Sequence, residues 1–363
     1  MIYETLTIII LVLGLLSLQK YNSKFKKLFV TVAGIAFTVF MGFRSFLVGT
    51  DTPGYVESFQ NTPKISLSFI LDAFAEKEAF YKVLQSLVRT VTDNYTVFFS
   101  VIAVFCICSV CRFIYKYSSN PTMSFIAYMS MAYYAFNLAG IRQTIALAIL
   151  LFAMDSMIEK KTVRALMLIG IASLFHISSL IGVFIILIYY LPLNGIYVAI
   201  CCAFSAFMYV SGNSLWKKVV DLVWEDTRGY KEDSGGTSTL ILLILISVGI
   251  AFIAPHIFAG KRTLANYSAE EQDKITVNAY FYRLLLFSIP FQVLAIYQAN
   301  AFRVAMIFHI VLLALLPNSV TFVKGDKERI LINLGLIGCL LIQLFVFTYW
   351  AADINPYTFF WQV

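Results

Sequence analysis

The sequence predicts an all-α polytopic membrane protein with about twelve transmembrane helices and short amphipathic helices in two external loops. Of its 363 residues, 60% are hydrophobic and 13% are charged, whereas soluble domains carry about 25% charged residues. The apolar residues also gather into long runs, and about 20 such residues are enough to cross a bilayer. This composition excludes a soluble enzyme, a nucleic-acid-binding module and a disordered chain.

Twelve apolar runs are the expected spans of one integral membrane domain, residues 1–363. They cover residues 4–19, 28–48, 96–115, 122–139, 142–158, 163–175, 177–191, 195–211, 239–259, 276–296, 301–317 and 330–350. The first run follows Glu4 rather than a basic leader, so we expect an uncleaved span and not a signal peptide. The stretch 163–191 is interrupted by polar residues, and it crosses the membrane either twice, as a helical hairpin, or once with a break.

Lys and Arg residues indicate which loops face the cytoplasm, because cytoplasmic loops carry an excess of them. The basic cluster within 20–27 predicts a cytoplasmic first loop and an external N-terminus. Alternation from there places fifteen basic residues in cytoplasmic loops and eight in external ones. A single crossing at 163–191 would invert the later loops and weaken this bias. Topology therefore accounts for much of the net charge of +7.

Two long external connections, 49–95 and 211–239, contain amphipathic sequences. Between Leu67 and Val88, apolar residues recur at helical spacing among charged ones. A shorter amphipathic piece lies within 216–224. Helices of this kind lie in the headgroup region of a membrane, where they either shape a site or only seal a loop.

Four arginines remain once the loop charges are assigned: Arg44, Arg142, Arg283 and Arg303. An Arg beside hydrocarbon is costly, so each is either an interfacial anchor or a ligand-binding residue. Three of them map to the external face, whereas Arg283 lies one or two turns into its span from the cytoplasmic end. Because these three come from distant parts of the chain, their convergence favours a site.

His176 lies at the predicted external break of 163–191 and shares that face with the arginines. His256 and His309 lie within apolar runs, where packing roles are expected. Clustered Arg side chains suit a diphosphate or carboxylate ligand, and an imidazole, or a carboxylate such as Asp51, can act as general base toward a hydroxyl. The sequence contains no nucleotide-binding, zinc-protease or serine-hydrolase motif, and we expect neither a metal ion nor a cofactor.

Two blocks of sequence carry a recognisable pattern. The first runs Gly42-Phe43-Arg44-Ser45, then Val48-Gly49-Thr50-Asp51-Thr52, then Tyr55 and Phe59; the second runs Gly140-Ile141-Arg142-Gln143-Thr144-Ile145-Ala146, then Phe175-His176-Ile177-Ser178-Ser179. Together they resemble the EpsG family, the Wzy-like polymerases of bacterial exopolysaccharide, capsule and O-antigen. Looser similarity continues through Tyr282-Arg283, Arg303 and Asn355-Pro356-Tyr357.

The resemblance implies a glycosyltransferase of the bacterial cytoplasmic (inner) membrane with its active site facing outside, toward the periplasm where there is one. Such an enzyme transfers a growing glycan from undecaprenyl diphosphate to an incoming lipid-linked repeat unit. The implied partners are this lipid-linked oligosaccharide and the bilayer, together with a chain-length regulator and a flippase. No nucleic acid is implied.

The resemblance also implies roles for individual residues. Arg142 and Arg303, together with Arg44, would bind the donor diphosphate, and Arg283 would be a further substrate contact. His176 would activate the acceptor hydroxyl, with Asp51 as the rival base. Further sugar or supporting contacts would come from Tyr55, Gln143, Ser178 and Ser179.

Other functions fit the same membrane setting. A polysaccharide ligase uses the same donor with another acceptor, and only the product distinguishes it from a polymerase. A transporter or flippase for lipid-linked sugars also needs a cationic cavity, but the cations here gather at one face, and the sequence shows no clear repeat of one half in the other. A purely structural scaffold would leave the four arginines unexplained.

Overall fold

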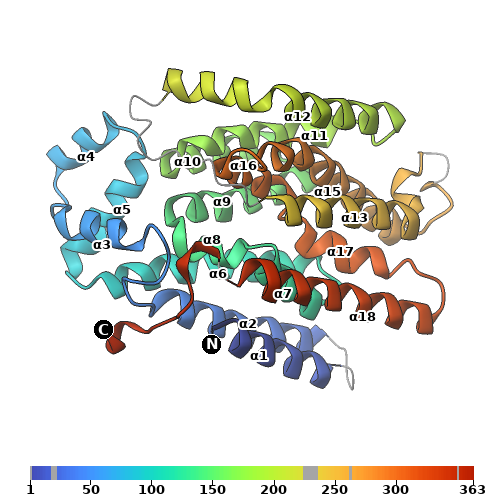
Figure 1. The fold of residues 1–363 in the computed structure, drawn as a ribbon, viewed down its shortest axis with the longest axis horizontal. Helices are drawn as coiled ribbons and strands as arrows, with labels where there is room; N and C mark the ends of the chain where they lie inside the picture. The colour runs from blue at the N-terminus through green and yellow to red at the C-terminus, as the bar shows by residue number, and fades with distance from the viewer. Residues whose placement is uncertain (1, 18–22, 224–235, 261–263, 350) are drawn as a thin grey trace. The chain divides into compact units, whose positions relative to one another are not determined.

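The structure is a computed structural model that describes residues 2–17, 23–223, 236–260, 264–349 and 351–363. Within these ranges the regular elements are helices (Figure 1), as the sequence predicted. The chain divides into unit 1, comprising Met1–Ile186 and Gly335–Val363, and unit 2, comprising Leu187–Leu334. Residues 224–235 of the predicted loop 211–239 lie outside the described residues, as do Lys20, Lys261 and Arg262.

Ten of the described helices lie wholly in unit 1. They are α1 (Ile2–Ser17), α2 (Ser23–Gly42), α3 (Thr52–Asn61), α4 (Leu67–Phe74), α5 (Ala79–Val91), α6 (Tyr95–Tyr117), α7 (Pro121–Ser130), α8 (Tyr133–Ala139), α9 (Ile141–Ile158) and α10 (Thr162–Phe175). A 3₁₀ turn, Ile177–Gly182, follows α10. Two helices, α11 (Val183–Tyr190) and α18 (Asp326–Ile342), each contribute residues to both units, and a π-helical turn, Gln343–Thr348, continues α18.

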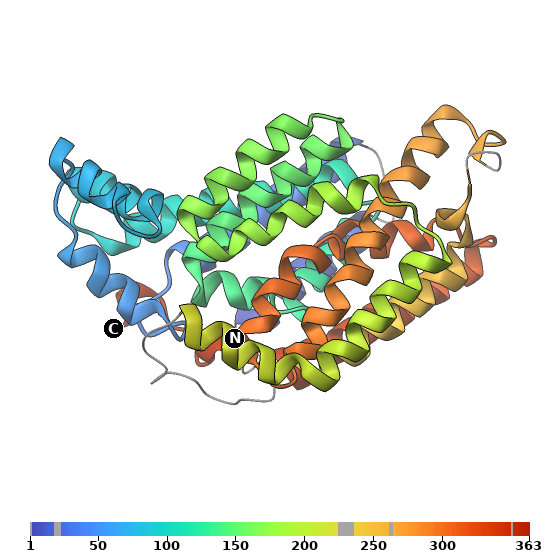
Figure 2. The same ribbon diagram turned by 90° about the horizontal axis from the view of Figure 1, so that it is seen from above.

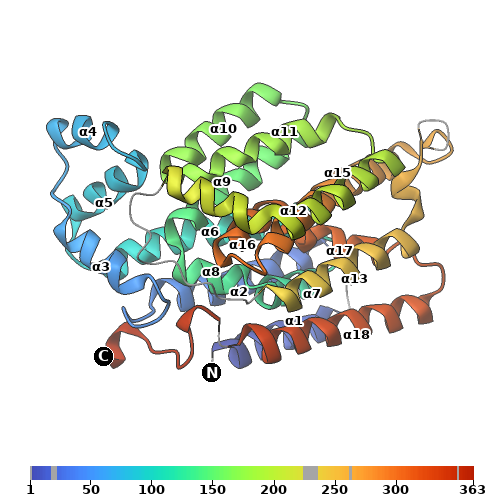
Figure 3. The same cartoon turned by 45° about the horizontal axis from the view of Figure 1, so that its top comes forward.

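Unit 2 is built around α15 (Ala269–Leu294), which packs against four other described helices of this unit. These are α12 (Gly195–Val223), α13 (Thr237–Ile253), α16 (Ala299–His309) and α17 (Leu312–Val320). Figure 3 shows α12 beside α15. The backbone of α12 stays helical to Val223, so part of the second predicted external loop continues the helix.

Six of the described helices are long and apolar enough to cross a membrane, or seven if α16 and α17, which meet at a 48° bend, count as one span. Shorter apolar helices occupy four more of the predicted spans. The chain is therefore a polytopic helical membrane protein, while the count of twelve spans stays a prediction.

The fourth predicted span, 122–139, is broken into α7 and α8. Ala132 between them has φ 60°, a left-handed conformation that costs an alanine about 1–2 kcal/mol. The Ser130 carbonyl accepts a hydrogen bond from Thr348 Oγ1 at 2.7 Å, which satisfies a backbone group at the break. Apolar composition continues through the break, so hydropathy could not reveal it.

The core of unit 1 lies around α9, because 83% of its 18 residues are buried. This helix packs against α6, α8 and α10, and it lies between α10 and α6 in Figures 1 and 3. Its two ends are chemically different. The C-terminal end carries an acidic cluster, and the N-terminal end carries Arg142.

The second predicted span ends at Gly42 rather than at residue 48, because the chain beyond it pairs with the C-terminal segment. Ser45 N donates to Thr358 O at 2.9 Å and Gly49 N to Asp353 O at 3.1 Å. Gly49 has φ +97°, and a Cβ there would lie 2.5 Å from the Leu138 carbonyl oxygen. The sequence Gly49-Thr50-Asp51 is thus a turn that only glycine fits well, and it leads directly into α3.

Asp155, near the C-terminal end of α9, is a buried carboxylate with three partners from α6. It accepts hydrogen bonds from Arg112 at 2.5 Å and from Lys116 and Tyr117, and its side chain is 3% exposed. These residues belong to the end of unit 1 predicted to face the cytoplasm. The cluster therefore ties α6 to α9 at that end.

Asp155→Asn is expected to lower the free energy of unfolding by about 2 kcal/mol, because two cations and a phenol lose a charged acceptor. Denaturant unfolding of the purified, detergent-solubilised protein measures this loss. Glu159→Gln is the matched control, because Glu159 contacts Lys116 and Lys161 at the exposed surface, where ion pairs contribute little. Equal losses in the two variants would show that the buried cluster does not stabilise the α6–α9 pair.

Candidate active site

The helical hairpin of α9 and α10 places Arg142 and His176 at one end of unit 1. Arg142 is the second residue of α9, and His176 directly follows the last residue of α10. The turn between the helices lies at the opposite end, so the start of one helix and the end of the other are neighbours. The antiparallel packing of α9 and α10 is enough to bring these two residues together.

Glu78 joins these two residues. Its Oε1 atom lies 2.7 Å from His176 Nδ1, and its Oε2 atom pairs with Arg142 Nη1. Because a carboxylate only accepts hydrogen bonds, Nδ1–H of His176 is the donor, and in the neutral imidazole the Nε2 lone pair is left to act as a base. The Glu78 side chain is 12% exposed, compared with 42% for Arg142 and 21% for His176.

The backbone of Glu78 is unusual. It precedes α5 with φ 61° and ψ 39° and makes no capping hydrogen bond with its side chain. A non-glycine residue in this region is uncommon and is often found at a functional site. The conformation interrupts the predicted amphipathic stretch 67–88 between α4 and α5, and the carboxylate is directed to Arg142 and His176 instead of to the helix.

The charge of Glu78 is maintained by its two partners. Burial raises the pKa of this carboxyl, but the hydrogen bond from His176 and the charge of Arg142 lower it more, so the pKa ends below its usual value. The stabilisation from these contacts is therefore complete above the ordinary Glu pKa of about 4.3 and is lost as the pH falls through the lowered pKa. At neutral pH, Glu78 is a carboxylate.

Two tyrosines lie against Arg142. The guanidinium carbon is 5.7 Å from the centre of the Tyr55 ring and 5.9 Å from that of Tyr81, within the range of cation–π attraction. Tyr55 comes from α3 and Tyr81 from α5, and Figure 1 shows these helices, with α4, gathered at one end of unit 1. Burial raises the pKa of the Tyr81 phenol well above its usual range, so its hydroxyl stays protonated.

Phe80 and Phe175 hold the start of α5 against the end of α10, with ring centres 5.7 Å apart. These residues are the neighbours of Tyr81 and His176 in the sequence. The contact therefore fixes Glu78 close to His176, and Figure 2 shows the α3–α5 group projecting at one side of unit 1. The amphipathic stretch 67–88, which was predicted to seal or shape a site, therefore supplies Glu78, the residue that joins Arg142 and His176.

Arg44, which follows the end of α2, is fully buried. Its Nη1 donates to the Met41 carbonyl, and its guanidinium carbon lies 4.1 Å from the centre of the Phe99 ring. Its Nε and Nη2 atoms make no hydrogen bond within the described part of the chain. Arg44 and Arg142 both act electrostatically on Tyr81, so the two cations share a neighbourhood, but only Arg142 has an exposed surface.

The other predicted residues of unit 1 surround this cluster in the sequence. Asp51 precedes α3, one turn before Tyr55. Gln143 is buried next to Arg142 on α9, and Ser179 is buried in the 3₁₀ turn after His176, whereas Ser178 is partly exposed. Their roles in binding or catalysis stay predictions.

Unit 2 contains the remaining two arginines. Arg283 on α15 is buried, and its Nη2 donates to the Tyr189 carbonyl at 3.3 Å, near the end of α11. A cation at a helix C-terminus satisfies a free carbonyl group, which gives Arg283 a structural role. Arg303 is partly buried on α16.

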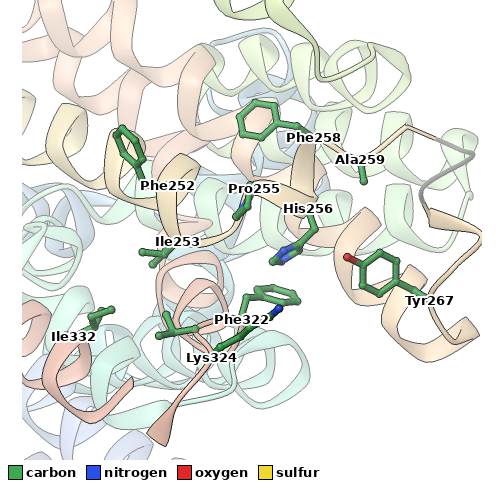
Figure 4. A pocket seen from close by; sticks show the side chains of 11 residues that line it. Phe252, Ile253, Pro255, His256, Phe258, Ala259, Tyr267, Phe322, Lys324 and Ile332 are labelled. Atoms are coloured by element: carbon green, nitrogen blue, oxygen red, sulfur yellow. The ribbon is translucent and has the colours of Figure 1, made fainter. Parts of the chain in front are cut away.

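The histidines of unit 2 differ from each other. His309 is fully buried, whereas His256 follows α13 in a short 3₁₀ turn and lines a cavity of about 640 Å³. Its ring centre is 3.7 Å from that of Phe322, and Figure 4 shows the Tyr267 hydroxyl pointing toward it. The cavity is walled mainly by apolar side chains, with Lys324 among the polar ones.

Glu78 was not predicted as a site residue. Glu76, Glu78 and Asp72 all lie between apolar positions of the same amphipathic stretch, so residue type does not distinguish them. The interruption of helical spacing between Phe74 and Phe80 was the available signal for a joint there. Within the described residues, no group of three or more potential ligands could hold a metal ion, and metal independence stays a prediction.

Comparison with known proteins completes the picture of this site. No curated protein and no solved structure matches the chain. The model of the EpsG family matches residues 4–359. This range contains α2 to α18 and every residue of the Arg142–Glu78–His176 cluster, and the chain therefore belongs to the EpsG family.

Proposed function

We propose that this protein is a bacterial surface polysaccharide polymerase that transfers a growing glycan from undecaprenyl diphosphate to an incoming lipid-linked repeat unit. Membership of the EpsG family supports a polymerase-type role for a helical membrane protein. The observation that carries the proposal is the Arg142–Glu78–His176 cluster, because it combines a cation for a phosphate with an oriented base.

The transfer exchanges one bond for another. The acceptor hydroxyl oxygen bonds to the anomeric carbon of the growing glycan, while the bond from that carbon to the diphosphate oxygen breaks and its electron pair leaves with the lipid diphosphate. His176 Nε2 takes the hydroxyl proton. Glu78 holds Nδ1–H, which fixes the tautomer and stabilises the imidazolium that forms, as the acid does in a Ser-His-Asp triad.

Arg142 stabilises the charge of the leaving diphosphate. Its guanidinium keeps its charge at any working pH and can bind two phosphate oxygens at once. Arg44 is fully buried and cannot contact substrate without rearrangement. We assign it to electrostatic support of Tyr55 and Tyr81, the two tyrosines that contact Arg142. Arg303 stays a second candidate for the diphosphate, and Arg283 a weaker one, given its bond to Tyr189.

His176 is preferred to Asp51 as the base because Glu78 orients it. The bond at Nδ1 aims the imidazole, whereas Asp51 occupies the entry to α3. We assign Tyr55, Gln143, Ser178 and Ser179 to sugar contact or support of these groups. The proposal places the cluster at the external face of the cytoplasmic membrane, in a chain of twelve spans that works with a flippase and a chain-length regulator.

Reconstitution of the purified protein with lipid-linked repeat units tests this function. We expect a ladder of lipid-linked glycans that grows one repeat at a time, without added metal. Transfer of preformed polymer to a different acceptor, with no ladder, would indicate a ligase instead. Movement of intact lipid-linked sugar across vesicle membranes without elongation would indicate a flippase, and either result would overturn the proposal.

A further inference from the structure

The Arg142 guanidinium is paired, yet it is open to a second ligand. Nη1 binds Glu78, but 42% of the side chain remains exposed. The faces of Tyr55 and Tyr81 hold the guanidinium from the protein side. An anion that approaches from solvent therefore meets a guanidinium whose position is set and whose charge is balanced by one carboxylate.

We infer that Glu78 is an internal substitute for the substrate's anion, and that the donor diphosphate displaces it from Arg142 while Glu78 keeps its bond to His176. This inference rests on the proposed function. The ligand class is a prenyl diphosphate, whose phosphate oxygens match the two-pronged guanidinium better than one carboxylate oxygen does.

The exchange needs little movement because Glu78 has two oxygens with different partners. Oε2 binds Arg142, and Oε1 binds His176 at 2.7 Å. Leaving a mostly buried carboxylate unpaired would be costly. When Arg142 turns to the diphosphate, however, Glu78 still has a partner. It keeps the imidazole as partner, and its backbone position is held by the Phe80–Phe175 contact.

The exchange links donor binding to activation of the acceptor. Before the donor binds, the Glu78 charge is divided between Arg142 and His176. Afterwards it acts on His176 alone, so the carboxylate is free of Arg142 when the imidazole takes the acceptor proton. Donor binding therefore prepares the leaving group and the base together, and an acceptor that arrives first meets a Glu78 that is still shared with Arg142.

Binding of farnesyl diphosphate to the purified full-length protein tests the exchange, with farnesyl monophosphate for comparison. Glu78→Gln keeps the shape of the side chain and removes its charge, so diphosphate affinity should rise about fivefold, which corresponds to about 1 kcal/mol. Turnover with lipid-linked repeat units should fall about 10²-fold, since His176 loses its anionic partner. Glu76→Gln is the matched control, because Glu76 pairs with Lys82 in the same segment.

Higher affinity with lower turnover in Glu78→Gln, and neither change in Glu76→Gln, would support the exchange. The gain in affinity should disappear when Glu78→Gln is combined with Arg142→Ala in a double variant. A gain that persists in the double variant, relative to Arg142→Ala alone, would overturn the inference. If the wild type binds the diphosphate and Glu78→Gln binds it equally or more weakly, the exchange is wrong while the proposed function stands. If no variant binds the diphosphate, both fail.

Discussion

His176→Ala is expected to reduce glycan elongation by about 10²–10⁴-fold, the contribution typical of a positioned general base. Without the imidazole, the acceptor hydroxyl has no group to take its proton. The Glu78 carboxylate cannot replace it, since Glu78 is largely buried. Single repeat units should therefore accumulate on the lipid carrier in cells while the amount of protein in the membrane is unchanged.

Gel analysis of lipid-linked glycans measures this effect, and His256→Ala is the matched control. His256 lies in unit 2 at the wall of the cavity beside Phe322, so its loss should leave the ladder of chain lengths intact. A normal ladder in His176→Ala would show that His176 is not the base. If Asp51→Ala then abolished elongation, Asp51 would take over that role.

The sequence was sufficient to predict that Arg142 and His176 lie at the same face, because that prediction needed only the order and length of the apolar runs. Apolar runs define helices, and two consecutive antiparallel helices bring the start of one beside the end of the next. The break at 176 and the turn before 141 are visible as polar or glycine residues. The helical membrane fold followed from the composition and from the same apolar runs.

Features set by tertiary contacts could not be predicted in this way. The break between α7 and α8 depends on a hydrogen bond from Thr348, more than 200 residues away. The early end of α2 depends on pairing with the C-terminal segment. Glu78 is distinguished from Glu76 by its backbone angle and by its two partners, and neither is recorded in local sequence. Likewise, the Tyr189 carbonyl that explains Arg283 lies on another helix.

Arg142→Ala is expected to lower elongation by about 10²–10³-fold, the usual cost of removing one group that stabilises charge in a transition state. Arg142→Lys should recover only part of this loss, because an ammonium keeps the charge but cannot bind two phosphate oxygens in one plane. Lys77→Ala is the control for general loss of positive charge, since Lys77 is exposed next to Glu78. Reconstituted elongation at saturating acceptor, with donor concentration varied, separates binding from turnover.

The comparison with Glu78→Gln determines what Arg142 does. If Arg142 served only to hold Glu78 in place, its removal in the Glu78→Gln background would cost nothing further. If it binds the diphosphate, elongation should fall again in the double variant, and by nearly the same factor as in the wild type, because the guanidinium then acts on substrate rather than through the carboxylate. Residues in contact are commonly coupled, so a small departure from additivity is expected. Complete loss of the second effect would remove Arg142 from the substrate site.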